Sequence, residues 1–268
     1  MKRKLIAAPY LVWMVVFIVV PLLMVAYFAF TDDNGAFTLE YVSEVAKYTN
    51  IFTRSIWLAA IATVICLLIA YPLAYILTGL ERNAQSTMLM IVMLPMWMNF
   101  LLRTYAWMTI LGNNGILNTL LGYLGLGPYK LMNTEGAVVL GMVYNYLPYM
   151  ILPLYSVMVK IDRSLIEAGQ DLGCNSMKVL AKIIVPLSLP GIMSGITMVF
   201  VPAISTFIIS RMLGGGGNLL IGDLIEMQFL GNSYNPNLGA GISLVLMVII
   251  LLIMTLMNQF DSDDRVLI

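Results

Sequence analysis

The stretch 160–190 reads KIDRSLIEAGQDLGCNSMKVLAKIIVPLSLP and has the pattern of two short helices joined by a tight turn. Ser164 and Glu167 have the spacing of a capping box, in which the serine caps a backbone N–H and the glutamate reaches back to the cap. This box predicts a first helix over 165–172. Gly173 follows at once and suits the left-handed residue that ends a helix.

The second half of the stretch predicts another helix. Asn175 or Ser176 can cap a helix over 177–184. Pro186 and Pro190 then predict an elbow where the chain enters the next apolar span, because proline interrupts the hydrogen bonds of a helix.

The first helix would carry an apolar face, since Leu165, Ala168 and Leu172 recur at spacings of three and four. A helix of about two turns is marginal in isolation and needs a surface to pack against. Two alternatives follow. The helix is either an amphipathic segment that rests on lipid or a knob that docks on a partner protein.

The composition places this stretch in a membrane protein. The 268 residues are 60% hydrophobic and 10% charged, with 14 Lys+Arg, 14 Asp+Glu and no His, whereas a soluble domain carries about 25% charge. The bilayer is therefore the main solvent. A sequence without His excludes Ser-His-Asp catalysis and His-based metal sites, and the few basic residues argue against nucleic acid. Cys66 and Cys174 form no spacing motif, so no disulfide framework is predicted.

Long uncharged stretches recur along the chain, each with at least the ~20 residues that cross the hydrocarbon core as a helix. A polar segment at 231–237 delays the start of the last span. The sequence thus predicts an all-α polytopic membrane protein with six transmembrane helices. We expect these helices at about 9–30, 56–79, 88–111, 136–159, 190–211 and 239–257.

The distribution of Lys and Arg predicts the orientation. An N-terminus inside the cell leaves more basic residues on the cytoplasmic segments than on the outer ones, so both termini and the loop 160–190 are expected in the cytoplasm. The apolar run of the first span is too long for a signal peptide and predicts a retained helix. We expect a first helix and outer loop over 1–54, a transmembrane domain over 55–258 and a tail over 259–268. The cytoplasmic basic residues are Lys2, Arg3, Lys4, Arg82, Lys160, Arg163, Lys178, Lys182 and Arg265.

The loop resembles the EAA loop of ABC importer permeases, whose pattern is E-A-A-x3-G-x9-I-x-L-P. The matching residues are Glu167, Ala168, Gly169, Gly173, Ile183, Val185 and Pro186. The chain departs from the pattern at Gly169, where alanine is expected, and at Val185, where leucine is expected. Both replacements keep a small or apolar side chain.

Three further stretches resemble the spermidine/putrescine branch of these permeases. They are RTYAW at 103–107, GMVYNYLP at 141–148 and NLLIGDLIEMQF at 218–229. The resemblance covers roughly four-fifths of the chain. Permeases for iron(III), thiamine, sulfate and molybdate share the EAA loop, so the loop by itself leaves those substrates open and the local stretches favour polyamines.

The resemblance implies the transmembrane domain of a type I ABC importer in a bacterial plasma (inner) membrane. Two permease subunits, here expected to be non-identical, form the path, an ABC ATPase dimer uses ATP and Mg²⁺, and a solute-binding protein delivers substrate. Carried onto this chain, Glu167 is the charged contact to the ATPase, Ala168 and Gly169 form the close-packing surface, and Gly173 makes the turn. The elbow at Pro186 is expected to pass force to the fifth span.

The sequence itself assigns ATP hydrolysis to another polypeptide. No G-x-x-x-x-G-K-[ST] motif occurs, and the glycines at 214–217 are followed by Asn218 without the lysine that phosphate binding requires. We therefore expect no catalytic residue, metal or cofactor in this chain.

Six residues are candidates for lining a path: Trp97, Asn99, Tyr144, Asn145, Asp223 and Glu226. Polar groups in lipid must face protein or a cavity, so the two asparagines either line the path or bond between helices. Asp223 and Glu226 would share one face of a helix and could attract a polycation, with a solvated loop face as the alternative.

Two arginines stand near these candidates. Arg103 lies deep in the third span and either extends to the outer interface or has a functional role. Arg211 precedes the glycine-rich turn by a few residues, where the resembling family often has an acid.

Two other function classes compete with an importer subunit. A secondary transporter would need acids or histidines within the spans to carry protons, and the expected spans contain none near their centres. An intramembrane enzyme would need a Ser-His dyad, an H-E-x-x-H motif or two aspartates within spans, and the sequence offers none of these.

Overall fold

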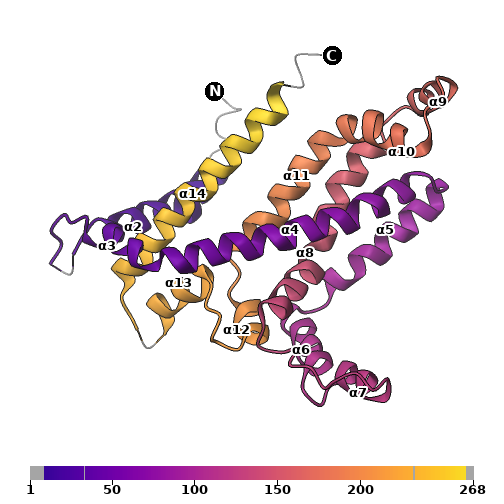
Figure 1. Cartoon of the computed structure of the whole chain (residues 1–268). Coiled ribbons are helices and arrows are strands. Elements are labelled where there is room, and N and C mark those ends of the chain that lie inside the picture. The colour runs from indigo at the N-terminus through magenta and orange to yellow at the C-terminus, as the bar shows by residue number, and fades with distance from the viewer. Residues whose placement is uncertain (1–8, 33, 232, 264–268) are drawn as a thin grey trace, which may run out of the picture.

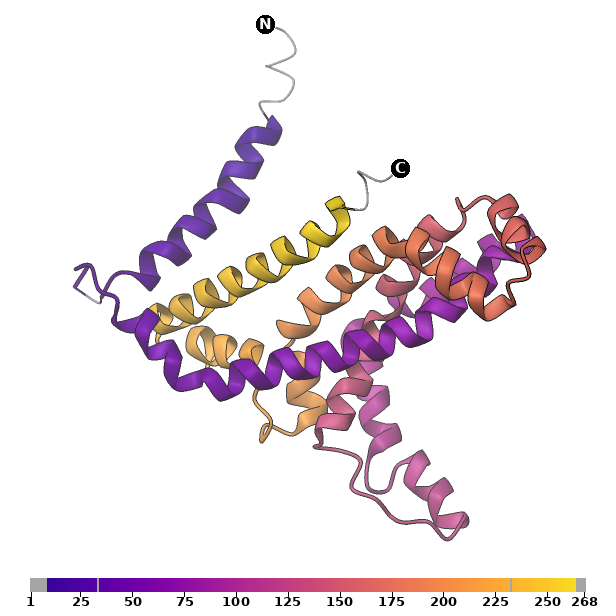
Figure 2. The same ribbon diagram turned by 45° about the horizontal axis from the view of Figure 1, so that its top comes forward.

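The computed structural model describes residues 9–32, 34–231 and 233–263, and within these ranges it contains helices and no strand. The elements in chain order are η1 (Val15–Val19), α2 (Val20–Ala29), α3 (Glu40–Glu44), η2 (Val45–Tyr48), α4 (Thr49–Thr78), α5 (Arg82–Trp97), α6 (Phe100–Leu111), α7 (Ile116–Tyr123), α8 (Glu135–Met158), α9 (Arg163–Asp171), α10 (Ser176–Val179), η3 (Leu180–Ile184), α11 (Val185–Ile204), α12 (Ile208–Gly214), α13 (Ile221–Leu230) and α14 (Pro236–Asp263). Figures 1 and 2 show α9 at one end of the bundle and α12 and α13 toward the other.

The spans predicted from uncharged stretches are present, with one of them broken. Five helices of the described residues are long and apolar enough to cross a membrane, and the bent pair α5 and α6–α7 makes a sixth crossing if it is counted as one. The last helix, α14, continues to Asp263 and so runs past the start expected for the tail. Lys2, Arg3, Lys4 and Arg265, on which the predicted orientation partly depends, lie outside the described residues.

The single helix predicted over 88–111 is wrong. The chain bends by 87° between Arg82–Trp97 and Phe100–Tyr123. Pro95 weakens the end of α5 because it cannot donate to the helix ladder. Asn99 then starts α6, since its side-chain oxygen accepts the N–H of Leu101 at 2.9 Å and that of Leu102 at 3.3 Å.

The elbow predicted at Pro186 and Pro190 is also wrong, because Ser176–Ile204 is one continuous helical segment. A wider π turn, η3, precedes the prolines, and the N–H of Val185 donates to the carbonyl of Leu180, five residues back. This change of register ahead of Pro186 lets the helix continue. The span also ends at Ile204 and not at 211, and α12 begins after a short break.

The core forms where α4, α8 and α11 pack together. One stripe of α4 carries only small residues at helical spacing, namely Ala59, Ala62, Cys66, Ala70 and Ala74, and all five are inaccessible to solvent. Small side chains allow neighbouring helix backbones to approach closely, which is the usual way helices associate in a bilayer. The stripe therefore fixes α4 against its neighbours.

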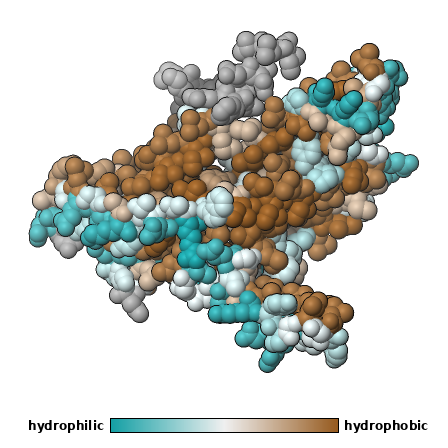
Figure 3. Space-filling model, in the orientation of Figure 1, coloured by the Kyte–Doolittle hydropathy of each residue, from teal (hydrophilic) through white to brown (hydrophobic). Residues whose placement is uncertain are grey.

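The surface agrees with a bilayer environment. Figure 3 shows a broad hydrophobic band across the helices, while hydrophilic residues gather toward the ends. Many large apolar side chains are exposed, for example Leu68 at 69% and Phe17 at 64%. Such a surface is stable in lipid and would associate in water.

Candidate functional site

The loop predicted to couple to a partner folds as a helix, a tight turn and a second helix. Helix α9 begins two residues earlier than expected, because the cap is Asp162 and not Ser164. The carboxylate of Asp162 accepts the backbone N–H of Ser164 at 3.0 Å. This hydrogen bond holds the pKa of Asp162 below its usual range.

The turn after α9 has the predicted left-handed glycine. Gly173 has a φ of +83°. Its N–H donates to the carbonyl of Gln170 at 2.8 Å, and the N–H of Cys174 donates to that of Gly169 at 3.1 Å. These two bonds define a Schellman motif. Asn175 caps the second helix by accepting the N–H of Lys178 at 2.9 Å, as one of the two predicted caps.

The two halves of the motif pack on each other through Gly169. A Cβ at this position would lie 2.6 Å from Cδ1 of Ile183 and 3.6 Å from Cγ2 of Val179. Gly169 is thus buried within this chain, whereas Ala168 on the same helix is exposed. The departure from the family pattern at Gly169 lets α9 lie directly on the helix that continues into the fifth span.

The outer face of α9 remains open. Leu165 is 46% exposed and Leu172 is 85% exposed, and Met177 on the following helix is 72% exposed. Ala168 is exposed on the same side of α9, whereas Glu167 is exposed on the side that lines the cavity described next. The apolar patch formed by Leu165, Ala168, Leu172 and Met177 is the face that the sequence left open to lipid or to a partner protein, and within the described part of the chain nothing covers it.

A cavity of about 590 Å³ lies behind α9, between it and the neighbouring ends of α4 and α8. Gln85 holds its wall in place. The side-chain amide of Gln85 donates to the carbonyl of Leu80 at 2.9 Å and its oxygen accepts the hydroxyl of Tyr155 at 2.9 Å, so the turn between α4 and α5 is tied to α8. Glu167 and Arg163 are among the lining residues.

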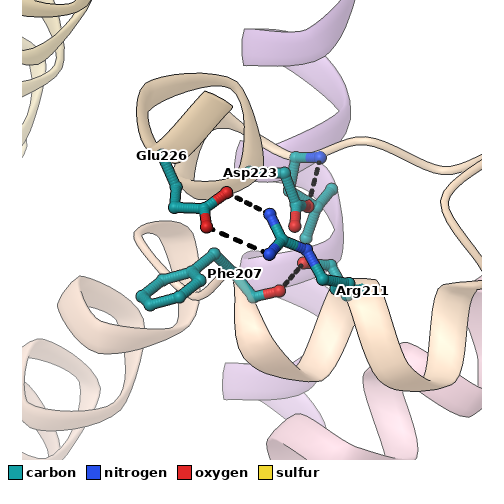
Figure 4. Close-up of polar contacts among 6 residues, drawn as sticks. Phe207, Arg211, Asp223 and Glu226 are labelled. Atoms are coloured by element: carbon teal, nitrogen blue, oxygen red, sulfur yellow. Dashed lines mark hydrogen bonds and ion pairs between the residues drawn. The ribbon is translucent and has the colours of Figure 1, made fainter. Parts of the chain in front are cut away.

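A second polar cluster lies at the opposite end of the bundle, on α12 and α13 (Figure 4). Asp223 is 2% exposed, and its Oδ2 accepts the N–H of Leu220 at 3.0 Å. Its Oδ1 is buried without a hydrogen-bond partner among the described residues. Burial raises the pKa of Asp223, against the lowering effects of Ser210, the Leu220 N–H and Arg211.

Arg211 forms a two-pronged ion pair with Glu226 in the same cluster (Figure 4). One N–H of Arg211 reaches Oε1 of Glu226 at 3.0 Å and the other contacts Oε2. The pair lowers the pKa of Glu226 and raises that of Arg211. The arginine found where the resembling family often has an acid therefore neutralises a carboxylate one helix away.

Arg54 ties the glycine-rich turn to the rest of the bundle. Its Nε donates to Glu135 at 2.8 Å, and its Nη2 contacts the side-chain oxygen of Asn218. On the same helix, the hydroxyl of Ser55 accepts the N–H of Ile221 at 2.9 Å at the start of α13. The cluster is thus anchored to α4 and α8.

The structure brings together only two of the six predicted path residues, Asp223 and Glu226. Trp97 is 73% exposed at the end of α5, and Asn99 is the cap of α6. Tyr144 packs edge-on against Trp107 with ring centroids 5.3 Å apart. Asn145 is buried and donates to the carbonyl of Gly141 at 2.8 Å, while its oxygen is unpartnered among the described residues.

The sequence reasoning missed the pairing of Arg211 with Glu226 and the burial of Arg103. Arg211 and Glu226 are 15 residues apart and lie on two different helices, so the spacing within one helix could not predict their pairing. Arg103 is only 8% exposed, so of the two alternatives for it the structure does not show the extension to the outer interface. No group of three metal-binding side chains occurs among the described residues.

Comparison with known families identifies a match over most of the chain. Residues 83–263 match the family described as binding-protein-dependent transport system inner membrane component. The chain is 37% identical over 261 residues to the spermidine/putrescine transport system permease protein PotB of Haemophilus influenzae, covering 94% of this chain and 91% of the relative. It is 36% identical over 247 residues to PotB of Escherichia coli K12, covering 88% and 90% respectively.

Solved structures share the fold. A bacterial ABC transporter involved in the import of the acidic polysaccharide alginate superimposes with a TM-score of 0.82 at 14% sequence identity, covering 98% of this chain and 96% of that one. A second structure of a bacterial alginate ABC transporter, in complex with its alginate-bound periplasmic protein, gives a TM-score of 0.81. At this identity the likeness establishes the fold alone.

Proposed function

Because the chain belongs to the family of binding-protein-dependent transport system inner membrane components, we propose that it is one permease subunit of an ATP-driven importer of spermidine or putrescine. The relatives that carry this assignment match the chain nearly end to end. The chain supplies half of the translocation path, and a second, non-identical permease supplies the other half.

The observation that supports coupling to a separate ATPase is the geometry of α9. The helix presents Glu167, Ala168 and the apolar patch to the outside, while Gly169 and Ile183 lock its inner side to the helix of the fifth span. An ABC ATPase dimer that uses ATP and Mg²⁺ would bind this patch. A displacement of α9 would then move Ser176–Ile204 as one body, because the helix is continuous past the prolines.

The remaining partners and the orientation are part of the same proposal. The α9 end is cytoplasmic, both termini are cytoplasmic, and a solute-binding protein docks at the opposite end of the bundle in a bacterial plasma membrane. The solved alginate transporter in complex with its periplasmic protein is a precedent for such an assembly on this fold.

The acids at the end opposite α9 are the part of the path best suited to a polyamine. Among the described residues Asp223 Oδ1 has no hydrogen-bond partner, and Glu226 is paired with the guanidinium of Arg211, a cation that an incoming ammonium group could replace. Both groups would pair with ammonium groups of the substrate. Trp97, Asn99, Tyr144 and Asn145 remain candidate path residues, with Tyr144 offering an aromatic face for a cation.

The test is uptake by the complete transporter reconstituted with its ATPase, second permease and solute-binding protein. We expect ATP-dependent uptake of labelled spermidine or putrescine, and we expect Glu167→Lys to abolish both ATPase binding and uptake. Glu81→Lys is the matched control, because Glu81 is an exposed acid at the same end of the bundle, at the start of α5.

Three outcomes would contradict the proposal. If Glu167→Lys behaves like Glu81→Lys, the coupling role of α9 is wrong. If sulfate, thiamine or iron(III) and not a polyamine is taken up, the substrate is wrong and the importer class stands. If uptake survives without ATP and collapses with the proton gradient, the chain is a secondary transporter.

A further inference from the structure

Helix α11 exposes a row of residues that differs from the lipid-facing surfaces of the bundle. The row takes every fourth residue, so its members follow one another along the helix. The first four members are exposed and the last is half-buried: Pro186, Pro190, Ser194, Met198 and Pro202. The exposed side of α14 carries large apolar residues instead, for example Leu251 at 54% and Leu252 at 59%.

Another side of α11 makes the contacts with α8. Gly191 and Gly195 are buried there. A Cβ at Gly191 would lie 3.0 Å from the carbonyl oxygen of Pro153, and a Cβ at Gly195 would lie 2.6 Å from the sulfur of Met150. These glycines let the two helices approach closely. The proline-containing row is therefore not used for packing within the described part of the chain.

The backbone of the row carries carbonyl oxygens that lack their usual partners. Proline has no N–H, so Pro190 removes the helix partner of the carbonyl of Pro186, and Pro202 removes that of the carbonyl of Met198. No described side chain donates to either oxygen. The hydroxyls that do bond to carbonyls of this helix reach Val185, Met193, Val201 and Pro202.

Ser194 adds a hydroxyl to the same row. The hydroxyl of Thr197, on the same helix, donates to the carbonyl of Met193 at 3.0 Å. Ser194 is exposed, and its hydroxyl forms no hydrogen bond with any described residue. The row thus presents one hydroxyl and two backbone carbonyls as oxygen acceptors.

Hydrocarbon is an unsuitable environment for this row. The helix belongs to the candidate membrane span Ser176–Ile204, and unpaired backbone groups at membrane depth are tolerated where they line a water-filled cavity or are buried in protein. Neutral oxygens suit a cation that must pass through. They accept hydrogen bonds from it, and they bind it weakly enough to release it.

The position of the row connects it with the acids of α13. Figures 1 and 2 show that α11 runs from the end near α10 to the end near α12. Exposed Ser205 directly follows α11, and its carbonyl and that of Thr206 lie close to Gly222, the neighbour of Asp223. An ammonium group that leaves the acids of α13 would therefore meet the oxygens of this row next.

We propose that this row of α11 lines the translocation path. The carbonyl oxygens of Pro186 and Met198 and the hydroxyl of Ser194 accept hydrogen bonds from the ammonium groups of a polyamine in transit. The inference rests on the proposed function, because it requires a cationic substrate. Pro190 and Pro202 are positioning residues, since they free the carbonyls and do not contact the substrate through a polar group of their own.

Replacing Pro190 with alanine separates this role from a structural one. Alanine supplies an N–H for the carbonyl of Pro186 and suits a helix interior better than proline. We therefore expect Pro190→Ala to melt at or above the wild-type temperature in detergent. In the transporter reconstituted with its ATPase, second permease and solute-binding protein, uptake of labelled spermidine should fall about tenfold or more, the usual effect of losing one hydrogen bond to a charged group.

Pro72→Ala is the matched control. Pro72 lies inside α4, and the carbonyl that it frees belongs to Leu68. Leu68 is 69% exposed and Val64, one turn earlier, is 54% exposed, so this row of α4 has the large apolar side chains of a lipid-facing surface. Pro72→Ala should leave uptake unchanged. Ser194→Ala should lower uptake, and Ser194→Thr should keep it near wild type because threonine retains the hydroxyl.

Labelling tests whether the row faces water. Cys174 is first changed to serine, and Cys66 is kept because it is buried. In this background, Ser194→Cys in the complete transporter should react with a charged, water-soluble thiol reagent, and spermidine should slow the reaction. Leu251→Cys on α14 is the control and should remain unreactive.

Other results would overturn the inference. If Pro190→Ala takes up spermidine as fast as Pro72→Ala, the freed carbonyl is not an acceptor for the substrate. If Ser194→Cys is as unreactive as Leu251→Cys, the row is covered: by the second permease if Pro190→Ala weakens the pairing of the two permeases, and by lipid if pairing is unchanged. Absence of ATP-dependent polyamine uptake by the wild-type transporter would refute the proposed function and the substrate named here with it, whereas the other failures occur with wild-type uptake intact.

Discussion

Replacing Gly222 with alanine tests the packing that holds Asp223 in place. Gly222 is the second residue of α13, and a Cβ there would lie 2.5 Å from the carbonyl oxygen of Ser205 and 2.6 Å from that of Thr206. Carbon normally stays about 3.3 Å or more from a carbonyl oxygen. The start of α13 must therefore move away from the end of the fifth span by about 0.7 Å, carrying Asp223 with it.

The expected loss in the free energy of unfolding follows from the atoms that the new Cβ would approach. Overpacking costs about 1–3 kcal/mol, and the upper end applies because both oxygens belong to the backbone and cannot rotate away. Alanine in place of glycine in a helix returns about 1 kcal/mol. The net loss is about 2 kcal/mol, which corresponds to a fall of roughly 4–8 °C in melting temperature for a chain of this size.

The assay is thermal unfolding of the detergent-purified chain, followed by tryptophan fluorescence. Gly122→Ala is the matched control, because Gly122 also lies in a helix, α7, and a Cβ there would meet nothing within 4 Å. The control should melt at or slightly above the wild-type temperature. If Gly222→Ala melts as high as the control, α13 does not approach the end of the fifth span as closely as described.

Three further predictions concern the polar clusters. Arg211→Gln should cost at most about 1 kcal/mol at pH 7, because the ion pair with Glu226 is partly exposed. That contribution is present above the ordinary pKa of a carboxyl and is lost as the pH falls through the lowered pKa of Glu226, so melting curves of wild type and variant should converge in acid. Asp223→Asn should have a higher melting temperature than wild type at pH 7 and the same melting temperature at pH 3. The reason is that the wild-type protein loses stability as the pH rises through the raised pKa of Asp223, and the variant does not. Asn99→Ala should lower stability by about 1 kcal/mol through loss of the cap, with Asn99→Asp as the tolerated control in the same denaturation series.

The long-range outline of the fold could be predicted from the sequence because a bilayer imposes a simple rule. An uncharged stretch of sufficient length must form a helix there, since lipid offers no hydrogen bonds to the backbone. The spans beginning with α4, α8 and α14 follow from that rule. The local turn at Gly173 was also predictable, because a left-handed residue directly after a helix strongly favours glycine.

Some prolines accompany a break in a helix and others do not, and the sequence pattern did not distinguish the two cases. Pro95 accompanies a break because Met98, the residue after α5, is extended and Asn99 caps a new helix. Pro186 accompanies no break because it follows a π turn closely and stands in the first turn of α11, and Pro190 lies inside the same continuous helix. The difference depends on packing around each turn, which local pattern does not contain.

The polar clusters were only partly predictable for a related reason. The spacing of Asp223 and Glu226 correctly placed both on one helix. It did not show that one would be buried and the other paired with Arg211, because each outcome depends on α12 folding against α13. The burial of Arg103 likewise depends on how α6 packs against α8 and α12, which the pattern within one span does not contain.

Close contacts connect α9, at one end of the proposed mechanism, with the acids of α13 at the other end. Gly169 of α9 packs closely on Ile183, which belongs to the continuous helix Ser176–Ile204. The backbone carbonyls of the next two residues after that helix lie close to Gly222, the neighbour of Asp223. Force applied to α9 would therefore reach the acids at the far end through one rigid helix rather than through a hinge at the prolines. Contiguity alone does not establish coupling. Gly222→Ala supplies the test, because it loosens the last contact while leaving α9 intact, so ATPase binding should persist while uptake falls.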